Sequence, residues 1–284
     1  MSEMIKWLQL TDWVKQLQPN RPFPGIGYVR CDSTQQLRDL QAAQSFLVII
    51  VQGYKRVVTQ TQELLLNSKQ AMAFPAHADF SIANTPENGA FYALVLQFSP
   101  EQLQGVQAAH GQLVEQVLAS KHYFKPFKVS ADLLSSLLHL LDALHSGIDH
   151  ALLMHRYNEV ILALLLSGQG GCLFVQPQAK WRDKVSQLIS LDPANHWSLE
   201  IMSERLHVSE TTLRRRLREE GVGFRQVLTD TRLGHGLYLL QSGLERRPIS
   251  DVSERCGYQS VSSFSAQFKT RFGMLPSQLQ KTVI

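Results

Sequence analysis

A short stretch near the C-terminus carries the side chains of this chain that are best suited to contact another molecule. Within residues 210–219, Leu213 and Leu217 have the spacing of one buried helix face. The outer arc of this helix then carries five polar side chains: Glu210, Thr211, Arg214, Arg215 and Arg218. An arginine here can donate two hydrogen bonds to O6 and N7 of guanine, which contributes about 1–3 kcal/mol of discrimination. The stretch therefore predicts a helix that reads bases in the major groove.

The same order of helix, turn and helix occurs again about fifty residues later. The two copies are residues 198–219 and 249–271, and in each copy a serine, Ser209 or Ser260, can cap the second helix. Two tandem helix-turn-helix units would present two helices to duplex DNA.

The second copy offers smaller side chains to a groove. Phe264 and Phe268 take the places of the two buried leucines. The candidate DNA-binding residues of this copy are Ser262, Ser265, Ala266 and Lys269. Because none of them makes the bidentate contacts of arginine, we expect this helix to read DNA by shape, phosphate and thymine-methyl contacts. The spacing leaves the orientation of Gln267 open.

A long helix is predicted between the two copies, over residues 224–241. Eighteen helical residues span about 27 Å. This length suits a strut that holds two recognition helices in successive major grooves, about 34 Å apart on one face of DNA. A further helix over residues 181–191 is expected to brace the first copy.

The last hundred residues resemble the DNA-binding domain of AraC/XylS-type bacterial transcriptional regulators. The most specific similarity is the run 249–278, with its Gly257-Tyr258 turn, its Phe-x3-Phe-Lys-x2-Phe-Gly frame and the Pro-Ser that follows. The resemblance implies seven helices. It also implies base contacts from Thr211, Arg214 and Arg215 in the first copy and from Ser262, Ser265 and Ala266 in the second.

Two positions depart from the family pattern. His207 stands where the first turn of the family has glycine, so this residue is expected to adopt a positive φ, which His tolerates better than most residues. Ala266 stands where some relatives have arginine, which weakens the case for base reading there.

The first hundred residues read as short strands. Val, Ile, Phe and Tyr are concentrated in residues 26–31, 46–52, 55–60, 70–74, 79–84 and 91–98, with turn residues between them. This pattern predicts a small β-barrel or sandwich, so the fold class is α+β with an all-α C-terminal part. The N-terminal half more loosely resembles cupin-like sensory domains of the same family, which implies an effector pocket in the barrel and dimerisation through the helices after it.

Two leucine-rich helices are expected after the strands. Leu137, Leu141 and Leu144 lie on the stripe of the first helix that we predict to form a homodimer interface. The alternative, of equal weight for each helix, is that these stripes pack on the barrel.

The predicted domains are residues 1–167 for the cupin-like sensory and dimerisation domain, 168–180 for a linker and 181–284 for the DNA-binding domain. From residue 180 onward there are 16 Lys and Arg against 11 Asp and Glu, a net charge of +5, whereas the preceding part has a net charge of −1 (12 against 13). A basic C-terminal half is the distribution expected of a protein that meets phosphate there.

Other chemistry has little support in the sequence. Lys55, Arg56 and His77 are candidate effector-binding residues, although we favour an exposed hairpin for the first two and a strand end for His77. The histidines lack the partners of a metal site, so no metal and no cofactor are expected.

We therefore predict a non-enzymatic transcriptional regulator, an activator, with duplex DNA as its partner and a small effector in the barrel. The resemblance adds RNA polymerase as a partner. Three separated cysteines and the lack of a signal-peptide h-region favour the cytoplasm. The alternatives are a repressor or effector-independent regulator of the same fold, or a cupin-type enzyme with a DNA-binding tail.

Overall fold

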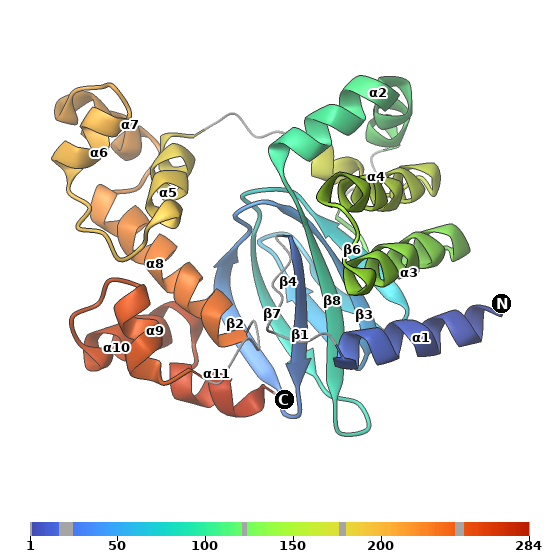
Figure 1. Cartoon of the computed structure of the whole chain (residues 1–284). Helices are drawn as coiled ribbons and strands as arrows, with labels where there is room; N and C mark the ends of the chain where they lie inside the picture. Colours follow the sequence, from blue (N-terminus) through green and yellow to red (C-terminus); the bar gives the residue numbers. More distant parts are fainter. Residues whose placement is uncertain (1, 17–24, 121–123, 176–179, 242–246, 284) are drawn as a thin grey trace. The chain divides into compact units, whose positions relative to one another are not determined.

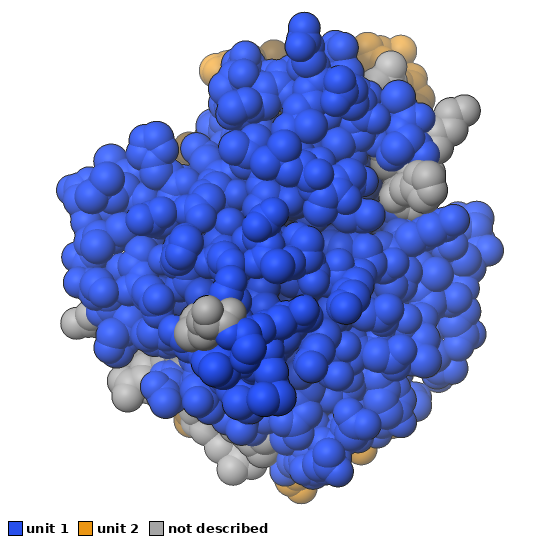
Figure 2. Space-filling view, turned by 90° about the vertical axis from the view of Figure 1, so that its right-hand side faces the viewer, with its two compact units in different colours: residues 1–176, 282–284 blue, residues 177–281 orange. Residues whose placement is uncertain are grey.

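The structure is a computed structural model that describes residues 2–16, 25–120, 124–175, 180–241 and 247–283 (Figure 1). The chain divides into two compact units, which are coloured separately in Figure 2. Unit 1 comprises residues 1–176 and 282–284, and unit 2 comprises residues 177–281. In the described part of the chain, no helix has both the length and the apolar character that a membrane span requires.

Unit 1 contains two antiparallel sheets that face each other. The five-stranded sheet has the order β1 (Ile26–Cys31), β8 (Phe91–Phe98), β3 (Ser45–Gln52), β6 (Gln70–Phe74) and β9 (Phe127–Lys128). The four-stranded sheet has the order β2 (Gln35–Gln41), β7 (Asp79–Thr85), β4 (Tyr54–Val58) and β5 (Glu63–Leu66). The α+β class is thus confirmed, with a cupin-like sandwich of two sheets in place of one closed barrel.

Strand β3 shows why the central strands have a nearly continuous run of apolar residues. Leu47 and Ile49 face the layer of helices, whereas Val48 and Ile50 belong to the core between the sheets. Successive side chains of a strand point to opposite faces, so a strand covered on both sides has no polar face.

Four helices cover the outer face of the five-stranded sheet, where Figure 1 shows α1 and α3 beside β3 and β8. They are α1 (Glu3–Gln16), α2 (Pro100–Ala119), α3 (Ala131–Ser146) and α4 (His150–Leu166). Helix α2 begins with a capping box, because the Ser99 side chain accepts a hydrogen bond from Gln102 N and the Gln102 side chain accepts one from Ser99 N.

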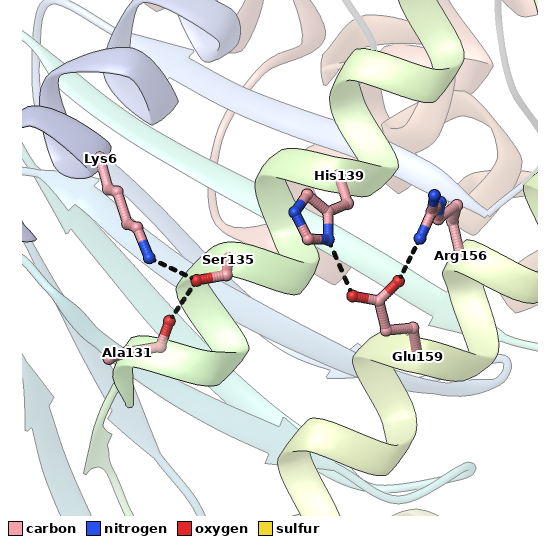
Figure 3. Close-up of polar contacts among 6 residues, drawn as sticks. All are labelled: Lys6, Ala131, Ser135, His139, Arg156 and Glu159. Carbon is pink, nitrogen blue, oxygen red and sulfur yellow. Dashed lines mark hydrogen bonds and ion pairs between the residues drawn. The ribbon is translucent and has the colours of Figure 1, made fainter. Parts of the chain in front are cut away.

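Polar contacts join the exposed edges of these helices (Figure 3). Lys6 Nζ donates to Ser135 Oγ at 2.6 Å and so connects α1 to α3. His139 and Arg156 both contact the carboxylate of Glu159, at 2.9 and 2.8 Å, which connects α3 to α4. These hydrogen bonds lower the pKa of Glu159, against the opposing effect of its partial burial.

The leucines predicted to form a dimer interface are placed differently. Leu137 and Leu141 are buried in the core of unit 1, with exposed fractions of 0% and 1%, and Leu144 packs partly buried against the same core. The prediction for Leu137 and Leu141 is wrong because α1 and α4 pack against α3 and cover its leucine stripe, so neither residue can reach a partner.

The predicted linker also differs from the structure at its start. Gly171–Phe174 form a short 3-10 helix, and Cys172, Leu173 and Phe174 are buried in the core of unit 1. Apolar side chains in a turn between units gain free energy by packing on the nearest core. Residues 176–179 of the predicted linker lie outside the described residues.

Unit 2 is helical throughout its described elements. The helices are α5 (Trp181–Leu191), α6 (Leu199–Arg205), α7 (Glu210–Glu219), α8 (Phe224–Gln241), α9 (Ile249–Arg255), α10 (Val261–Phe272) and α11 (Pro276–Thr282). These are the seven helices that the resemblance implied. The bounds of α7 and α8 coincide with the predicted ones.

Candidate nucleic-acid interface

The first helix-turn-helix unit has its own small core. Val185 and Ile189 of α5, Met202 of α6, and Leu213 and Leu217 of α7 are buried together. Helix α5 is fixed at its start by Glu220, whose carboxylate accepts hydrogen bonds from the backbone N–H groups of Trp181 and Arg182 at 2.6 and 2.9 Å. The buried leucines of α7 and the carboxylate of Glu220 thus contact α5 and α6, and the opposite face of α7 is left to solvent.

The turn between α6 and α7 is tight and hydrogen-bonded. The N–H groups of His207 and Val208 donate to the carbonyls of Glu204 and Ser203, at 3.1 and 3.0 Å. His207 has a φ of 54°, so the expected left-handed conformation is confirmed for a residue that carries a side chain. Ser209 then caps α7 by accepting from Thr212 N at 3.2 Å.

Helix α7 presents its polar side chains outward. Thr211, Arg214, Arg215 and Arg218 are all exposed. The side chains of Arg214 and Arg215 are 62% and 63% exposed, and each lies near a glutamate one turn away, at 3.5 and 3.7 Å. Exposed ion pairs of this kind contribute about 0–1 kcal/mol, so both guanidinium groups can exchange these partners for a ligand at little cost.

The second helix-turn-helix copy repeats the backbone of the first. The N–H groups of Gly257 and Tyr258 donate to the carbonyls of Glu254 and Ser253, at 2.8 and 3.0 Å, as in the first turn. Gly257 has a φ of 74° and occupies the position of His207. Its turn is one residue longer, because Gln259 precedes the cap Ser260.

Helix α10 exposes smaller side chains. Ser262, Ala266 and Lys269 are exposed and Ser265 is half-buried. Phe264, Phe268 and Phe272 are buried on the opposite side. Gln267, whose orientation the sequence left open, donates to Ser263 Oγ at 3.1 Å and accepts from the Tyr258 hydroxyl at 3.2 Å, so it supports the turn.

Helix α8 joins the two helix-turn-helix copies of unit 2 through close packing. Gly236 lies against the Phe264 ring, where an added Cβ would come within 2.9 Å of a ring carbon. Arg232 donates to the carbonyls of Pro193 and Asn195, both at 2.9 Å, and burial lowers the pKa of its guanidinium. Arg271 of α10 pairs with Asp230 of α8 at 3.3 Å. The predicted strut therefore contacts α10 of the second helix-turn-helix copy and the loop that precedes the first copy.

The three candidate effector-binding residues of unit 1 do not form one site. Lys55 points into the sandwich and is buried, whereas its neighbour Arg56 is exposed on the other face of β4 and pairs with Glu63 of β5 at 3.3 Å. Arg56 thus fits the hairpin interpretation. His77 lies in the turn between β6 and β7 with a φ of 63°.

Lys55 has an environment that its sequence context did not reveal. Its Nζ donates to Asn84 Oδ1, and Asn84 Nδ2 donates to Gln35 Oε1 at 3.1 Å. Burial lowers the pKa of Lys55 to about 7. Within the described residues no carboxylate pairs with this ammonium group.

Sequence reasoning also missed Arg225, at the start of α8, which lines a groove together with Arg214 and Arg218 of α7. A pattern of two arginines one turn apart, a Gly-Val-Gly turn and a third arginine would have drawn attention to it.

Comparisons with known proteins agree with this arrangement. Residues 22–172 match the family profile described as "AraC-type transcriptional regulator N-terminus", and residues 202–282 match "Helix-turn-helix domain". The HTH-type transcriptional regulator YdeO of Escherichia coli K12 is 29% identical over 132 residues, which cover 45% of this chain and 51% of YdeO. The urease operon transcriptional activator of E. coli is 38% identical over 97 residues, 34% of this chain and 32% of that protein. The chain thus spans about half, or less, of the length of these relatives.

A solved structure extends the likeness to both units. ToxT from Vibrio cholerae superposes with a TM-score of 0.63 over 90% of this chain and 98% of ToxT, at 17% identity. At that identity the superposition shows a shared fold.

Proposed function

The chain belongs to the AraC-type transcriptional regulators, and we propose that it is a sequence-specific DNA-binding regulator that activates transcription. The observation that carries this proposal is that both helix-turn-helix copies expose the outer face of their second helix to solvent. Helix α7 supplies Thr211, Arg214, Arg215 and Arg218, and α10 supplies Ser262, Ser265, Ala266 and Lys269. The relatives include the HTH-type transcriptional regulator YdeO and two proteins named as transcriptional activators.

In this proposal the two helices have different tasks. Arg214 and Arg215 donate to guanine edges, whereas the small side chains of α10 follow groove shape and thymine methyl groups. Three converging metal ligands would favour the alternative of a cupin-type enzyme; among the described residues there is no group of three or more His, Cys, Asp or Glu side chains that could hold a metal ion.

The experiment compares Arg215→Ala with Arg156→Ala, an arginine on α4 whose side chain is 47% exposed. Fragments bound by the native protein are first selected from genomic DNA, and affinities are then measured for a selected operator and a random duplex. We expect Arg215→Ala to lose about 1–3 kcal/mol on the operator and much less on random DNA. An equal loss on both duplexes would assign Arg215 to phosphate, and a protein that selects no fragments would contradict the proposal.

A second part of the proposal concerns an effector in unit 1. Lys55 is a buried amine with an amide partner and no paired carboxylate among the described residues. A bound anion would stabilise the protonated form of this group. ToxT from Vibrio cholerae has been solved with a bound unsaturated fatty acid and with bound (E)-4-(8-methylnaphthalen-1-yl)but-3-enoic acid. We therefore propose a carboxylate with an apolar body as the effector class.

Calorimetric titration with oleate tests this part. Binding by the native protein and by Arg56→Ala, with loss of binding in Lys55→Met, is the expected result, because Arg56 lies on the opposite face of the same strand. Equal affinities in all three proteins would exclude Lys55 as the anion ligand.

Other partners follow from the family. A homodimer and RNA polymerase are proposed partners, and binding to chromosomal DNA places the proposed function in the cytoplasm. Because Leu137 and Leu141 are core residues, the homodimer would have to use other side chains of unit 1.

A further inference from the structure

A groove of about 920 Å³ runs beside the first recognition helix. One wall is the C-terminal half of α7, and the other is formed by the loop before α8 and the first turns of that helix. The lining residues are Trp197, Ser198, Leu199, Arg214, Arg218, Gly221, Val222, Gly223, Phe224, Arg225 and Leu228. The groove lies entirely within unit 2.

The charge of this groove is positive. Arg214 and Arg218 enter it from α7 and Arg225 enters it from α8, and none of the described lining residues is acidic. Glu220, which lies between these arginines in the sequence, is engaged at the start of α5. Three arginines that face one space repel each other, and an anion between them removes that repulsion.

The wall and the floor of the groove leave room for a bulky ligand. A Cβ added at Gly221 or at Gly223 would meet no heavy atom within 4 Å, so the loop wall is open. Leu199, Phe224 and Leu228 are half-buried and give the groove an apolar floor. A deoxyribose can pack on such a floor while the phosphates on either side of it reach the arginines.

We propose that this groove binds the sugar-phosphate backbone of the DNA strand that borders the major groove occupied by α7. The assignment rests on the proposed function and on continuity, because Arg214 belongs both to the groove and to the exposed arc of α7. Arg218 of α7 and Arg225 of α8 each bind phosphate. Together they fix the depth and direction in which α7 enters the DNA.

Two variants test the groove, and both make its charge less positive. Arg225→Ala removes a positive charge. Gly223→Asp adds a negative one at the N-cap of α8, where the Gly223 carbonyl accepts from Val227 N at 3.1 Å and where aspartate is a favoured residue. The matched control is Gly234→Asp, at an exposed and open position nine residues after Arg225, which is half a rotation of α8 away from Arg225 at 3.6 residues per turn.

We expect all three variants to keep the native melting temperature or exceed it. Gly223→Asp and Arg225→Ala should weaken binding to a selected operator and to a random duplex by the same factor. For Arg225→Ala, the slope of log affinity against log salt should also fall in magnitude by about one. Gly234→Asp should bind like the native protein.

The proposal is overturned if Gly223→Asp and Gly234→Asp bind DNA equally well, or if the loss in Arg225→Ala is confined to the operator. In either case the proposed function stands as long as the native protein prefers its operator. A native protein that binds no duplex would instead contradict the proposed function itself.

Discussion

At the scale of single residues, the two turns show how one backbone is built with different side chains. His207 and Gly257 have left-handed backbones with φ of 54° and 74°, and the same pair of hydrogen bonds surrounds each. A residue with a Cβ is strained in this region by about 1 kcal/mol or more, whereas glycine is not. The first turn therefore holds a strain that the second lacks.

This difference predicts opposite effects of exchanging the two residue types. His207→Gly should raise the free energy of unfolding by a few tenths to about 1 kcal/mol, because the strain is removed at the expense of a more flexible unfolded chain. Gly257→Ala should lower it, since the new Cβ would come within 2.7 Å of the Arg232 guanidinium and 2.9 Å of the Pro193 carbonyl. Urea denaturation measures both changes. Destabilisation by His207→Gly would show that the imidazole makes a contact that outweighs the strain.

Lys55 predicts a pH dependence of stability. Its pKa is about 7 in the folded protein and 10.5 in the unfolded chain. Between these values the unfolded chain binds more protons, so the folded state gains stability as the pH rises from about 7. Between pH 7 and 8.5 the native protein should gain up to about 1.4 kcal/mol per pH unit relative to Lys55→Met. Parallel denaturation midpoints for the two proteins across this range would contradict a buried amine whose pKa is lowered to about 7.

At the scale of elements, α8 acts as the common support of both recognition helices. It contacts α5, α9 and α10, and its Gly236 allows the Phe264 ring of α10 to approach its backbone. This close approach is what sets the distance between α8 and the second recognition helix.

Two glycines two residues apart on α8 give a matched pair for testing this packing. Gly236→Ala should destabilise the protein by about 1–3 kcal/mol, because its Cβ would overlap the Phe264 ring and the Cys256 sulfur. Gly234→Ala should stabilise it by up to about 1 kcal/mol, because that position is open and alanine favours a helix. Thermal unfolding of the two variants in opposite directions is the expected result. Similar melting temperatures would mean that α8 and α10 pack less closely than described.

The helices of unit 2 could be predicted from the sequence because their signals are local. The caps Ser209 and Ser260 and the i, i+4 pairs of buried side chains lie within each helix. In unit 1 six strands were predicted, but β2, β5 and the two-residue strand β9 were not. Strand β2 is mostly polar because it pairs only with β7, at the edge of its sheet, and β5 has four residues.

The candidate site was predictable for a related reason, and its errors have a physical cause. Exposure of Arg214 and Arg215 follows from the position of the two leucines on the same helix. Burial of Leu137 and Leu141 depends on α1, more than a hundred residues earlier, which no local pattern announces. The burial of Lys55 likewise depends on strands that lie beside β4 in the fold but elsewhere in the sequence.

At the scale of the whole molecule, the chain combines a sandwich that contains a buried lysine, Lys55, with a helical unit that carries two recognition helices. Each unit has its own core, as expected of two domains that can each be stable by themselves. The basic charge is concentrated in the helical unit, where the proposed partner is an acidic polymer.

Chemical footprinting on a fragment selected from genomic DNA tests the central claim, that α7 and α10 read one duplex together. The account predicts two protected major-groove segments on one face of the DNA, about one helical turn apart, with the segment at guanines lost in Arg215→Ala and the other retained. A single protected segment, two segments on opposite faces, or an unchanged footprint in Arg215→Ala would contradict it.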